Sequence, residues 1–181
     1  TYTAPGHSCI YTGSVPGING IIGNNWFNRN SGTTIYCTDD NSYQTVGDNT
    51  AAGKMSPHQL LTTTICDELK LATNFKAKTV GIAIKDRSSI LPAGHTADAA
   101  YWFSGESGNW ISSTYYRTAL PQWVQKSNLN LAKNAKMNET WKTLLSLDRY
   151  QESTIDDASW ESPFKNEKAP VFIHDVKELL E

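Results

Sequence analysis

The chain has 181 residues, enough for one domain with a real hydrophobic core or for part of a larger domain. Its hydrophobic fraction of 39% is that of a globular protein, and no apolar run reaches the length that crosses a bilayer. A formal net charge of −2 argues against non-specific binding to nucleic acid, which requires a basic surface, but leaves room for a local basic pocket that binds a small anion.

The chain opens without Met or a signal peptide, directly on a pattern typical of a helix N-terminus. We expect Thr3 to cap this helix with its hydroxyl, while Pro5, which has no N–H, is tolerated in the first turn. The helix should run to about Gly13, since glycine readily takes the conformation that ends helices. Because a cap needs a preceding segment to position it, we expect the chain to be a fragment that a strand precedes in the parent protein.

The next segments predict a turn and a β-hairpin. Residues 15–20 have the glycine and proline content of a turn. Trp26-Phe27 and residues 34–37 are rich in aromatic and β-branched residues, and a turn at residues 29–32 separates them. Residues 39–53 are polar and are expected to form a surface loop.

A helix followed by a strand is the next expected pair. Ser56 would cap the helix, Pro57 would take its first position, and the helix would end near Thr73-Asn74. Its apolar stripe would consist of Leu60, Leu61, Ile65, Leu69 and Leu71. Residues 78–84 are a continuous apolar run, typical of a buried parallel strand, so the pair indicates an α/β sheet.

Fewer patterns mark the second half of the chain, and residues 141–150 do not separate helix from strand. The other expected elements are a turn or short helix at 88–94, a hairpin of 99–103 with 109–112, a helix from Pro121 with breaks to about Ala135, a loop at 151–168 and a short helix at 175–181.

Two cations, Lys85 and Arg87, follow directly on the predicted parallel strand, at the edge where open α/β sheets bind ligands. An ammonium and a guanidinium together suit an oxyanion with charge on several oxygens. The simpler alternative is a solvated turn whose charges pair with Asp86. The Asn24 amide could donate to the same anion or be a turn residue. The Thr3 hydroxyl lies at the positive end of a helix dipole, where phosphate is favoured, or it only caps.

The residue types that bind metals show no metal-site spacing. No two histidines are spaced as metal ligands, and His7 could either support Thr3 or simply pack. Cys9, Cys37 and Cys66 form no CxxC motif. One disulfide with one free thiol and three buried thiols both remain open, so the cysteines do not fix the compartment.

Three stretches, at residues 3–7, 20–26 and 81–95, resemble the alkaline phosphatase superfamily. More narrowly, they are similar to PafA-type bacterial alkaline phosphatases, close relatives of the nucleotide pyrophosphatase/phosphodiesterases. The Lys-Asp-Arg motif is the most specific of the three, because it occurs in the monoesterase branch. The resemblance implies an α/β fold, a partial alkaline-phosphatase-like α/β/α sandwich with β-hairpin insertions, over residues 1–181.

The resemblance also implies a role for each matching residue. Thr3 would be the nucleophile, transiently phosphorylated and a ligand of one of two zinc ions. Asn24 would bind a non-bridging phosphate oxygen, and Lys85 and Arg87 would contact the phosphoryl group. The family's other zinc ligands have no counterpart: the chain has no DxxxH motif and no Asp-His dipeptide, and His174-Asp175 has the reverse order in an expected linker. We therefore expect the isolated chain neither to bind the zinc pair nor to turn over phosphate esters.

The parent is thus expected to hydrolyse small phosphate monoesters through a phosphothreonine intermediate. A nucleotide pyrophosphatase/phosphodiesterase is the alternative enzyme. A non-catalytic carbohydrate-binding module is the alternative of another class, suggested by the many Trp, Tyr and Asn residues. Neither nucleic acid nor a membrane span is expected. Only the resemblance implies a periplasmic or secreted location, and the sequence does not set the oligomeric state.

Overall fold

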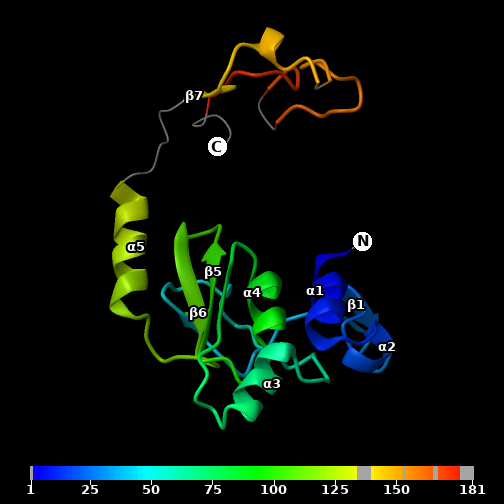
Figure 1. Ribbon diagram of the computed structural model, residues 1–181, viewed down its shortest axis with the longest axis vertical. Coiled ribbons are helices and arrows are strands. Elements are labelled where there is room, and N and C mark those ends of the chain that lie inside the picture. The colour runs from blue at the N-terminus through cyan, green and yellow to red at the C-terminus, as the bar shows by residue number, and fades with distance from the viewer. Residues whose placement is uncertain (1, 134–139, 153, 165–166, 176–181) are drawn as a thin grey trace. The chain divides into compact units, whose positions relative to one another are not determined.

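The structure, a computed structural model, describes residues 2–133, 140–152, 154–164 and 167–175 and forms two compact units, Thr1–Lys133 and Asn134–Glu181 (Figure 1). The elements of the first unit are α1 (Thr3–Thr12), α2 (Pro16–Asn19), β1 (Asn25–Asn28), β2 (Thr33–Tyr36), β3 (Thr45–Val46), α3 (Ile65–Ala72), β4 (Val80–Ala83), α4 (Asp86–Ala93), β5 (Ala99–Ser104), β6 (Asn109–Ser113) and α5 (Gln122–Lys133). Those of the second unit are β7 (Thr140–Trp141), the 3₁₀ helix η1 (Leu147–Arg149) and β8 (His174–Asp175).

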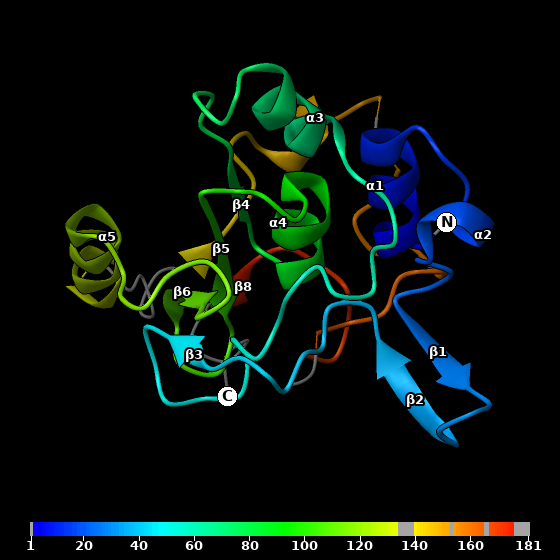
Figure 2. The ribbon, with the colours of Figure 1, turned by 90° about the horizontal axis from the view of Figure 1, so that it is seen from below.

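The first unit is built around a four-stranded mixed sheet in the order β3-β6-β5-β4. Strands β5 and β6 form an antiparallel hairpin, whereas β4 runs parallel to β5, and α4 connects the two. Helix α4 lies on one face of the sheet and α5 on the other (Figure 2), and α1 packs against α4. This arrangement confirms the predicted α/β/α class. The separate hairpin of β1 and β2 confirms the predicted hairpin addition.

Strand β4 differs from the buried strand that its apolar sequence predicts. Val80 and Ile82 are 51% and 57% exposed, because β4 lies at the end of the sheet order and both side chains point away from α4. Gly81 points the other way, and a Cβ there would collide with the backbone carbonyl of Ser89 in α4. The missing side chain thus lets α4 approach the strand closely.

Helix α3 begins eight residues later than predicted, at Ile65 rather than Pro57. Ser56 does accept the N–H of His58, but its hydroxyl donates to Asp40, and residues 57–64 do not form a helix. The helix is instead capped by Thr64, whose side chain and that of Asp67 bond each other's backbone N–H groups in a capping box. Of the predicted stripe only Leu60 is buried; the exposed members are Leu61, Ile65, Leu69 and Leu71. The apolar residues have helical spacing from Leu60 onward, but the capping box determines where the helix begins.

The other predictions for the first unit are largely confirmed. Helix α1 ends at Gly13, whose φ of 65° is left-handed, and both hairpins pair as expected. Two short elements were missed: the turn at residues 15–20 contains α2, and the loop at residues 39–53 contains β3, which pairs with β6.

The second unit contains less regular structure. The segment 141–150 holds the end of β7 and η1, and the described part of 151–168 is loop. The prediction of a linker at His174-Asp175 is wrong, because these residues form strand β8. Asp175 is therefore a strand residue and not the start of a helix. Ala135 and residues 176–181, where a helix end and a final helix were predicted, lie outside the described residues.

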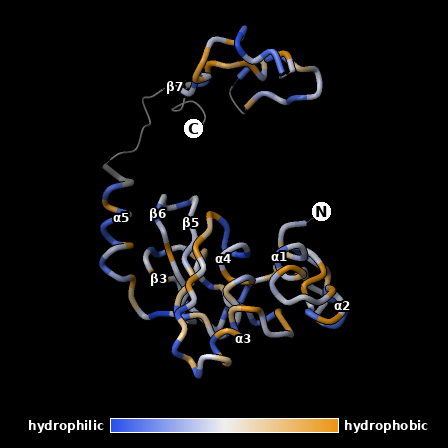
Figure 3. The backbone as a smooth tube through the Cα atoms, viewed as in Figure 1, coloured by the Kyte–Doolittle hydropathy of each residue, from blue (hydrophilic) through white to orange (hydrophobic). Residues whose placement is uncertain are grey.

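Three buried clusters form the core of the first unit. One, made of Ala4, Ile21, Cys37, Leu60 and Leu91, joins α1, the hairpin and α4. Figure 3 shows that the central strands carry hydrophobic segments, whereas α5 is mostly hydrophilic. No helix in the described ranges combines the length and apolar character needed to cross a membrane. The three cysteines, all described, form no disulfide, which agrees with the three-thiol alternative, but only Cys37 is buried, whereas Cys9 and Cys66 are half-buried.

Candidate functional site

Thr3 lies at the start of α1, although not as its cap. The N-cap is Tyr2, which makes no side-chain capping bond, so Thr3 is the first helical residue and the predicted cap was placed one residue too late. Thr3 is half-buried. Its carbonyl accepts a hydrogen bond from Nδ1 of His7 at 2.9 Å, which leaves Nε2 of a neutral His7 as an acceptor. The Thr3 hydroxyl bonds no other residue in the described part of the chain, and it stands in the first turn, where the helix dipole favours an anion.

Asn24 connects this helix terminus to the hairpin. Its Oδ1 accepts the N–H of Ala4 at 2.9 Å, and its backbone carbonyl accepts the N–H of Cys37 at 3.0 Å. Asn24 therefore supplies the cap that Tyr2 does not, and its Nδ2 keeps both protons for another acceptor. The interpretation of Asn24 as a turn residue does not account for its side chain, which bonds the first turn of α1.

Lys85 and Arg87 flank the start of α4, at the carboxyl end of β4. Lys85 is the N-cap residue and is exposed, whereas Arg87 is half-buried in the first turn. Arg87 Nη1 donates to the Tyr36 hydroxyl at 2.8 Å. Its Nε is buried and has no acceptor among the described residues. A buried donor of this kind is costly when unpaired, so it points to an acceptor that the described residues do not supply, such as an oxygen of a bound anion.

The simpler turn model predicted that Asp86 pairs with Lys85 and Arg87, but its hydrogen-bond partners are two hydroxyl groups. Its Oδ1 accepts the Tyr36 hydroxyl at 2.9 Å and its Oδ2 accepts the Thr38 hydroxyl at 2.5 Å. Sequence reasoning missed Tyr36, Thr38 and Asp86 as site residues. One signal could have found two of them: Tyr36 and Thr38 carry hydroxyls and are two residues apart around the end of a predicted strand, a spacing that places strand side chains on one face.

These contacts set the protonation of the site. Burial and the Asp86 charge raise the pKa of Tyr36, so its hydroxyl remains a donor at neutral pH. Burial raises the pKa of the Cys37 thiol to about 12, which keeps it neutral. Burial lowers the pKa of Arg87, but its bond to Tyr36 and the nearby negative charge outweigh this, and the net direction is upward. The site therefore presents a permanent cation next to two neutral side chains.

The four predicted site residues belong to one connected region of the first unit. Ala4, next to Thr3, bonds Asn24, and Asn24 pairs with Cys37. The residues on either side of Cys37 hold Arg87 and Asp86 at the start of α4. The N-terminus of α1, Asn24 and the N-terminus of α4, which carries Lys85 and Arg87, are thus connected through the base of the β1–β2 hairpin. Chemically, this arrangement suits an oxyanion with several charged oxygens.

The same region provides few metal ligands. Within the described ranges, no group of three or more His, Cys, Asp or Glu side chains could hold a metal ion. Of the four candidate residues only Thr3 carries a group that could ligate a metal through an ionised hydroxyl. The described residues therefore do not by themselves fit a complete metal site.

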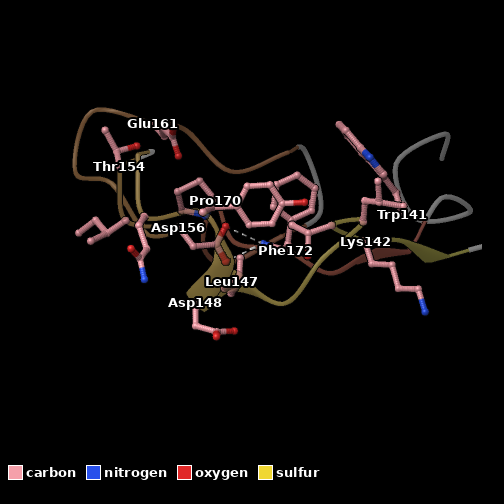
Figure 4. A pocket seen from close by; sticks show the side chains of 14 residues that line it. Trp141, Lys142, Leu147, Asp148, Thr154, Asp156, Glu161, Pro170 and Phe172 are labelled. Carbon is pink, nitrogen blue, oxygen red and sulfur yellow. Dashed lines mark hydrogen bonds between the residues drawn. The ribbon is translucent and has the colours of Figure 1, made fainter.

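A cavity lies in the second unit. It has a volume of about 800 Å³ and includes Trp141, Asp156 and Phe172 in its wall. The Asp156 carboxylate accepts the backbone N–H of Phe172 at 3.1 Å, so it is used in folding this loop (Figure 4). The cavity contains none of the four candidate residues.

Comparison with known proteins identifies relatives along the whole chain. A family model described as type I phosphodiesterase / nucleotide pyrophosphatase matches residues 1–177. A "Calcium-transporting ATPase" from Myroides odoratus is 53% identical over 179 residues, 99% of this chain and 33% of that protein. Alkaline phosphatase PhoV from Synechococcus elongatus is 49% identical over 178 residues, 98% of this chain and 32% of that protein. The chain therefore spans about a third of the length of the curated relatives it matches.

A solved structure gives the same result. The crystal structure of wild-type alkaline phosphatase PafA matches with a TM-score of 0.91 at 44% identity, over 99% of this chain and 34% of that one. PafA from Elizabethkingia meningoseptica is 45% identical over 173 residues, 95% of this chain and 32% of that protein. A PafA mutant with a threonine, an asparagine, a lysine and an arginine replaced matches with a TM-score of 0.90. The predicted resemblance and fold are confirmed, and nothing in these matches supports the carbohydrate-binding alternative.

Proposed function

We infer, from the fact that this chain belongs to the type I phosphodiesterase / nucleotide pyrophosphatase family, that it is the phosphate-contacting segment of a longer phosphoric ester hydrolase. Residues 1–181 would form one part of an alkaline-phosphatase-like domain, in agreement with the third of its relatives' length that the chain covers. The longer enzyme would be secreted or periplasmic, a proposal that rests on the alkaline phosphatases among the relatives.

One observation carries the proposal: the hydrogen-bond chain from Ala4 through Asn24 and the hairpin base to Arg87 connects the first turn of α1, which carries Thr3, with a guanidinium that has a buried donor without a described partner. In our proposal Thr3 is the nucleophile, the Asn24 amide donates to a non-bridging oxygen, and Lys85 and Arg87 stabilise the charge on the transferred phosphoryl group. Positioning and electrostatics carry most of the catalysis in phosphoryl transfer, so these roles are sufficient for a large rate effect.

The residues replaced in the PafA mutant support this assignment. In that mutant the threonine and the asparagine are as far apart in the chain as Thr3 and Asn24 are here. The replaced lysine and arginine are separated by one residue, as Lys85 and Arg87 are by Asp86. The four residue types also follow in the same order.

A monoester is the substrate that the charges favour. A phosphate monoester carries a second negative charge that a diester lacks, and two cations from one helix terminus match it better. The phosphodiesterase or nucleotide pyrophosphatase activity that the family description names remains the second candidate. The ratio of kcat/KM for 4-nitrophenyl phosphate and bis-4-nitrophenyl phosphate decides between the two.

Metal ions belong to the proposal for the longer enzyme only. Two zinc ions would supply an acidified nucleophile and a Lewis acid for the leaving oxygen, with Thr3 as the one ligand from this chain. The remaining ligands would come from outside the described residues. We accordingly propose that the chain by itself is inactive.

The test replaces Thr3 in the longer enzyme. Thr3→Ala should lower kcat by roughly a thousandfold or more, because the nucleophile is removed. Thr3→Ser should retain most activity, and Thr12→Ala, at the other end of α1, is the control that should leave it unchanged. Zinc content is measured in parallel, and acid quenching during turnover should yield a phosphorylated peptide containing Thr3. An active Thr3→Ala enzyme would exclude the proposed nucleophile.

A further inference from the structure

We propose that Tyr36 is a positioning residue that holds the Arg87 guanidinium toward the bound anion, and that Asp86 and Thr38 fix Tyr36 in this role. The proposal rests on the phosphate-contacting role proposed for Arg87. It adds three residues of the described structure that have no role in the function proposed above.

The available donors and acceptors determine the direction of each hydrogen bond to Tyr36. The Tyr36 hydroxyl has a single proton, and both of its partners are charged groups: Asp86 Oδ1 at 2.9 Å and Arg87 Nη1 at 2.8 Å. An ionised carboxylate can only accept and a guanidinium can only donate. Tyr36 must therefore donate to Asp86 and accept from Arg87, and this is one orientation rather than an average of several.

The carboxylate that directs Tyr36 is itself held in place. Asp86 Oδ2 accepts the hydroxyl of Thr38, whose side chain is fully buried. Because Tyr36 and Thr38 approach from the hairpin and Asp86 belongs to α4, the three residues fix the hairpin base against the helix terminus. The guanidinium carbon of Arg87 also lies 6.0 Å from the centre of the Tyr36 ring, at the outer limit of a cation–π contact.

Because Tyr36 lies between Asp86 and Arg87, the carboxylate can balance the charge of the guanidinium without occupying its N–H donors. A direct Asp86–Arg87 pair would occupy the guanidinium donors that an anion needs. With Tyr36 placed between them, the carboxylate balances the positive charge of Arg87 nearby, while only Nη1 is used. The buried Nε keeps its proton free of any described partner, as a site for a phosphoryl oxygen requires.

The Asp86 contacts could also serve only to stabilise the fold, so the experiment must separate a stabilising role from a positioning role. We therefore test coupling between Tyr36 and Arg87 in the longer enzyme. The single variants Tyr36→Phe and Arg87→Ala and the double variant are compared for kcat/KM on 4-nitrophenyl phosphate and for inhibition by inorganic phosphate. Tyr43→Phe is the matched control, since its hydroxyl bonds no other described residue and it lies outside the proposed site.

If Tyr36 acts through Arg87, Tyr36→Phe should lower kcat/KM and phosphate affinity by roughly tenfold or more, the effect of losing a hydrogen bond to a charged group. In the Arg87→Ala background the same change should have less than about a twofold effect, because there is no guanidinium left to position. Tyr43→Phe should match the unmodified enzyme.

A loss from Tyr36→Phe that is equally large in both backgrounds would overturn the proposal and leave the proposed function standing, as would no loss at all. An Arg87→Ala enzyme with full activity would instead remove the phosphate-contacting role of Arg87, and this inference with it.

Thr38 gives a second, independent series. Thr38→Ser keeps the hydroxyl that donates to Asp86, whereas Thr38→Val removes it with little change in volume. We expect Thr38→Ser to retain phosphate affinity and Thr38→Val to lose part of it. Equal affinity in the two variants would count against the role of Asp86 and Thr38 in positioning Tyr36, whatever the fold stability of either variant.

Discussion

The Asn24 side chain closes the first turn of α1 by accepting the backbone N–H of Ala4 at 2.9 Å, from 20 residues away in the chain. A local N-cap normally comes from the residue just before the helix. Here the cap comes from the segment that precedes the hairpin, so the position of the helix terminus depends on a long-range contact. One side chain thereby joins a folding role, through its oxygen, to the proposed binding role of its NH₂ group.

The two roles of Asn24 can be separated by substitution. Asn24→Asp keeps an oxygen for Ala4 N–H, and its negative charge is favourable at a helix N-terminus, so α1 should remain stable. The same charge repels a phosphoryl group, and kcat/KM should fall by about a hundredfold or more. Asn24→Ala removes both functions and should also destabilise α1 by about 1 kcal/mol.

Hydrogen exchange of the α1 amides and phosphate ester hydrolysis measure the two effects on the same samples. Equal protection in Asn24→Ala and the unmodified enzyme would show that the Ala4 contact does not support the helix. Full activity of Asn24→Asp would show that the amide donor is not used.

Lys85 offers a test in which stability and activity should change in opposite directions. Its ammonium stands at the N-terminus of α4, where a positive charge is unfavourable by about 0.3–1 kcal/mol. Lys85→Ala should therefore leave the fold intact or slightly stabilise it while it lowers kcat/KM. Lys126→Ala, an exposed lysine on α5, is the control and should change neither. If Lys85→Ala lowers stability and spares activity, Lys85 is a structural residue.

Acid should weaken the junction of α3 and β4 through Asp98. The bond from the buried ammonium of Lys70, at 2.7 Å, lowers the pKa of Asp98, and the N–H of Thr79 and the ammonium of Lys78 act in the same direction. A carboxylate with a lowered pKa stabilises the fold above its unfolded pKa and loses this contribution as pH falls, here below about pH 4.

The measurement is hydrogen exchange of the peptides that cover α3 and β4, as a function of pH and corrected for intrinsic exchange. Asp98→Asn leaves the Lys70 charge without its carboxylate and should lower local stability by roughly 2 kcal/mol at neutral pH, the value of a hydrogen bond to a charged group. It should also remove the acid transition. Glu106→Gln, in the exposed turn between β5 and β6, should leave both unchanged. An acid transition that persists in Asp98→Asn would assign it to another group.

Gly94 is expected to be the least replaceable glycine after α4. Its φ of 78° is left-handed, and a Cβ there would collide with the carboxylate of Asp67. That carboxylate accepts N–H groups from Thr64, His95 and Thr96, so it cannot move away without losing them. Gly94→Ala should lower thermal stability by well over 1 kcal/mol. Gly105→Ala, where a Cβ meets nothing within 4 Å, should be neutral.

The sequence was informative where local chemistry decides the structure. Gly13 ends α1 as predicted, and the two hairpins follow from β-branched and aromatic runs joined by turns. The order of a helix followed by an apolar strand predicted the α/β class correctly. These features depend on residues that are close in the chain, and their preferences agree with the final fold.

The sequence was less informative where a distant residue decides. The Ser56-Pro57 pair has the local pattern of a helix start, but the Ser56 hydroxyl donates to Asp40. The helix begins only after Thr64, which forms a capping box with Asp67. Likewise, Thr3 looks like a cap until Asn24 supplies the capping oxygen from outside. Exposure of Val80 and Ile82 depends on the order of strands in the sheet, which periodicity does not contain.

For the candidate site, the motifs and the resemblance predict four residues but not the residues that surround them. Asp86 lies between two of the four, yet its partners Tyr36 and Thr38 are about fifty residues away. No short pattern could connect them. Charge reasoning paired Asp86 with its neighbours in sequence, whereas the hairpin supplies two hydroxyls at a better geometry.

The β1–β2 hairpin is a two-stranded sheet of its own, and all its hydrogen bonds to the two helix termini come from its base. Its tip, at residues 29–32, is exposed. Insertions or deletions at the tip should therefore be tolerated without a change in the arrangement of Asn24, Tyr36 and Arg87. The tip is accordingly a suitable place to attach a fluorescent label that reports on the site while leaving its contacts intact.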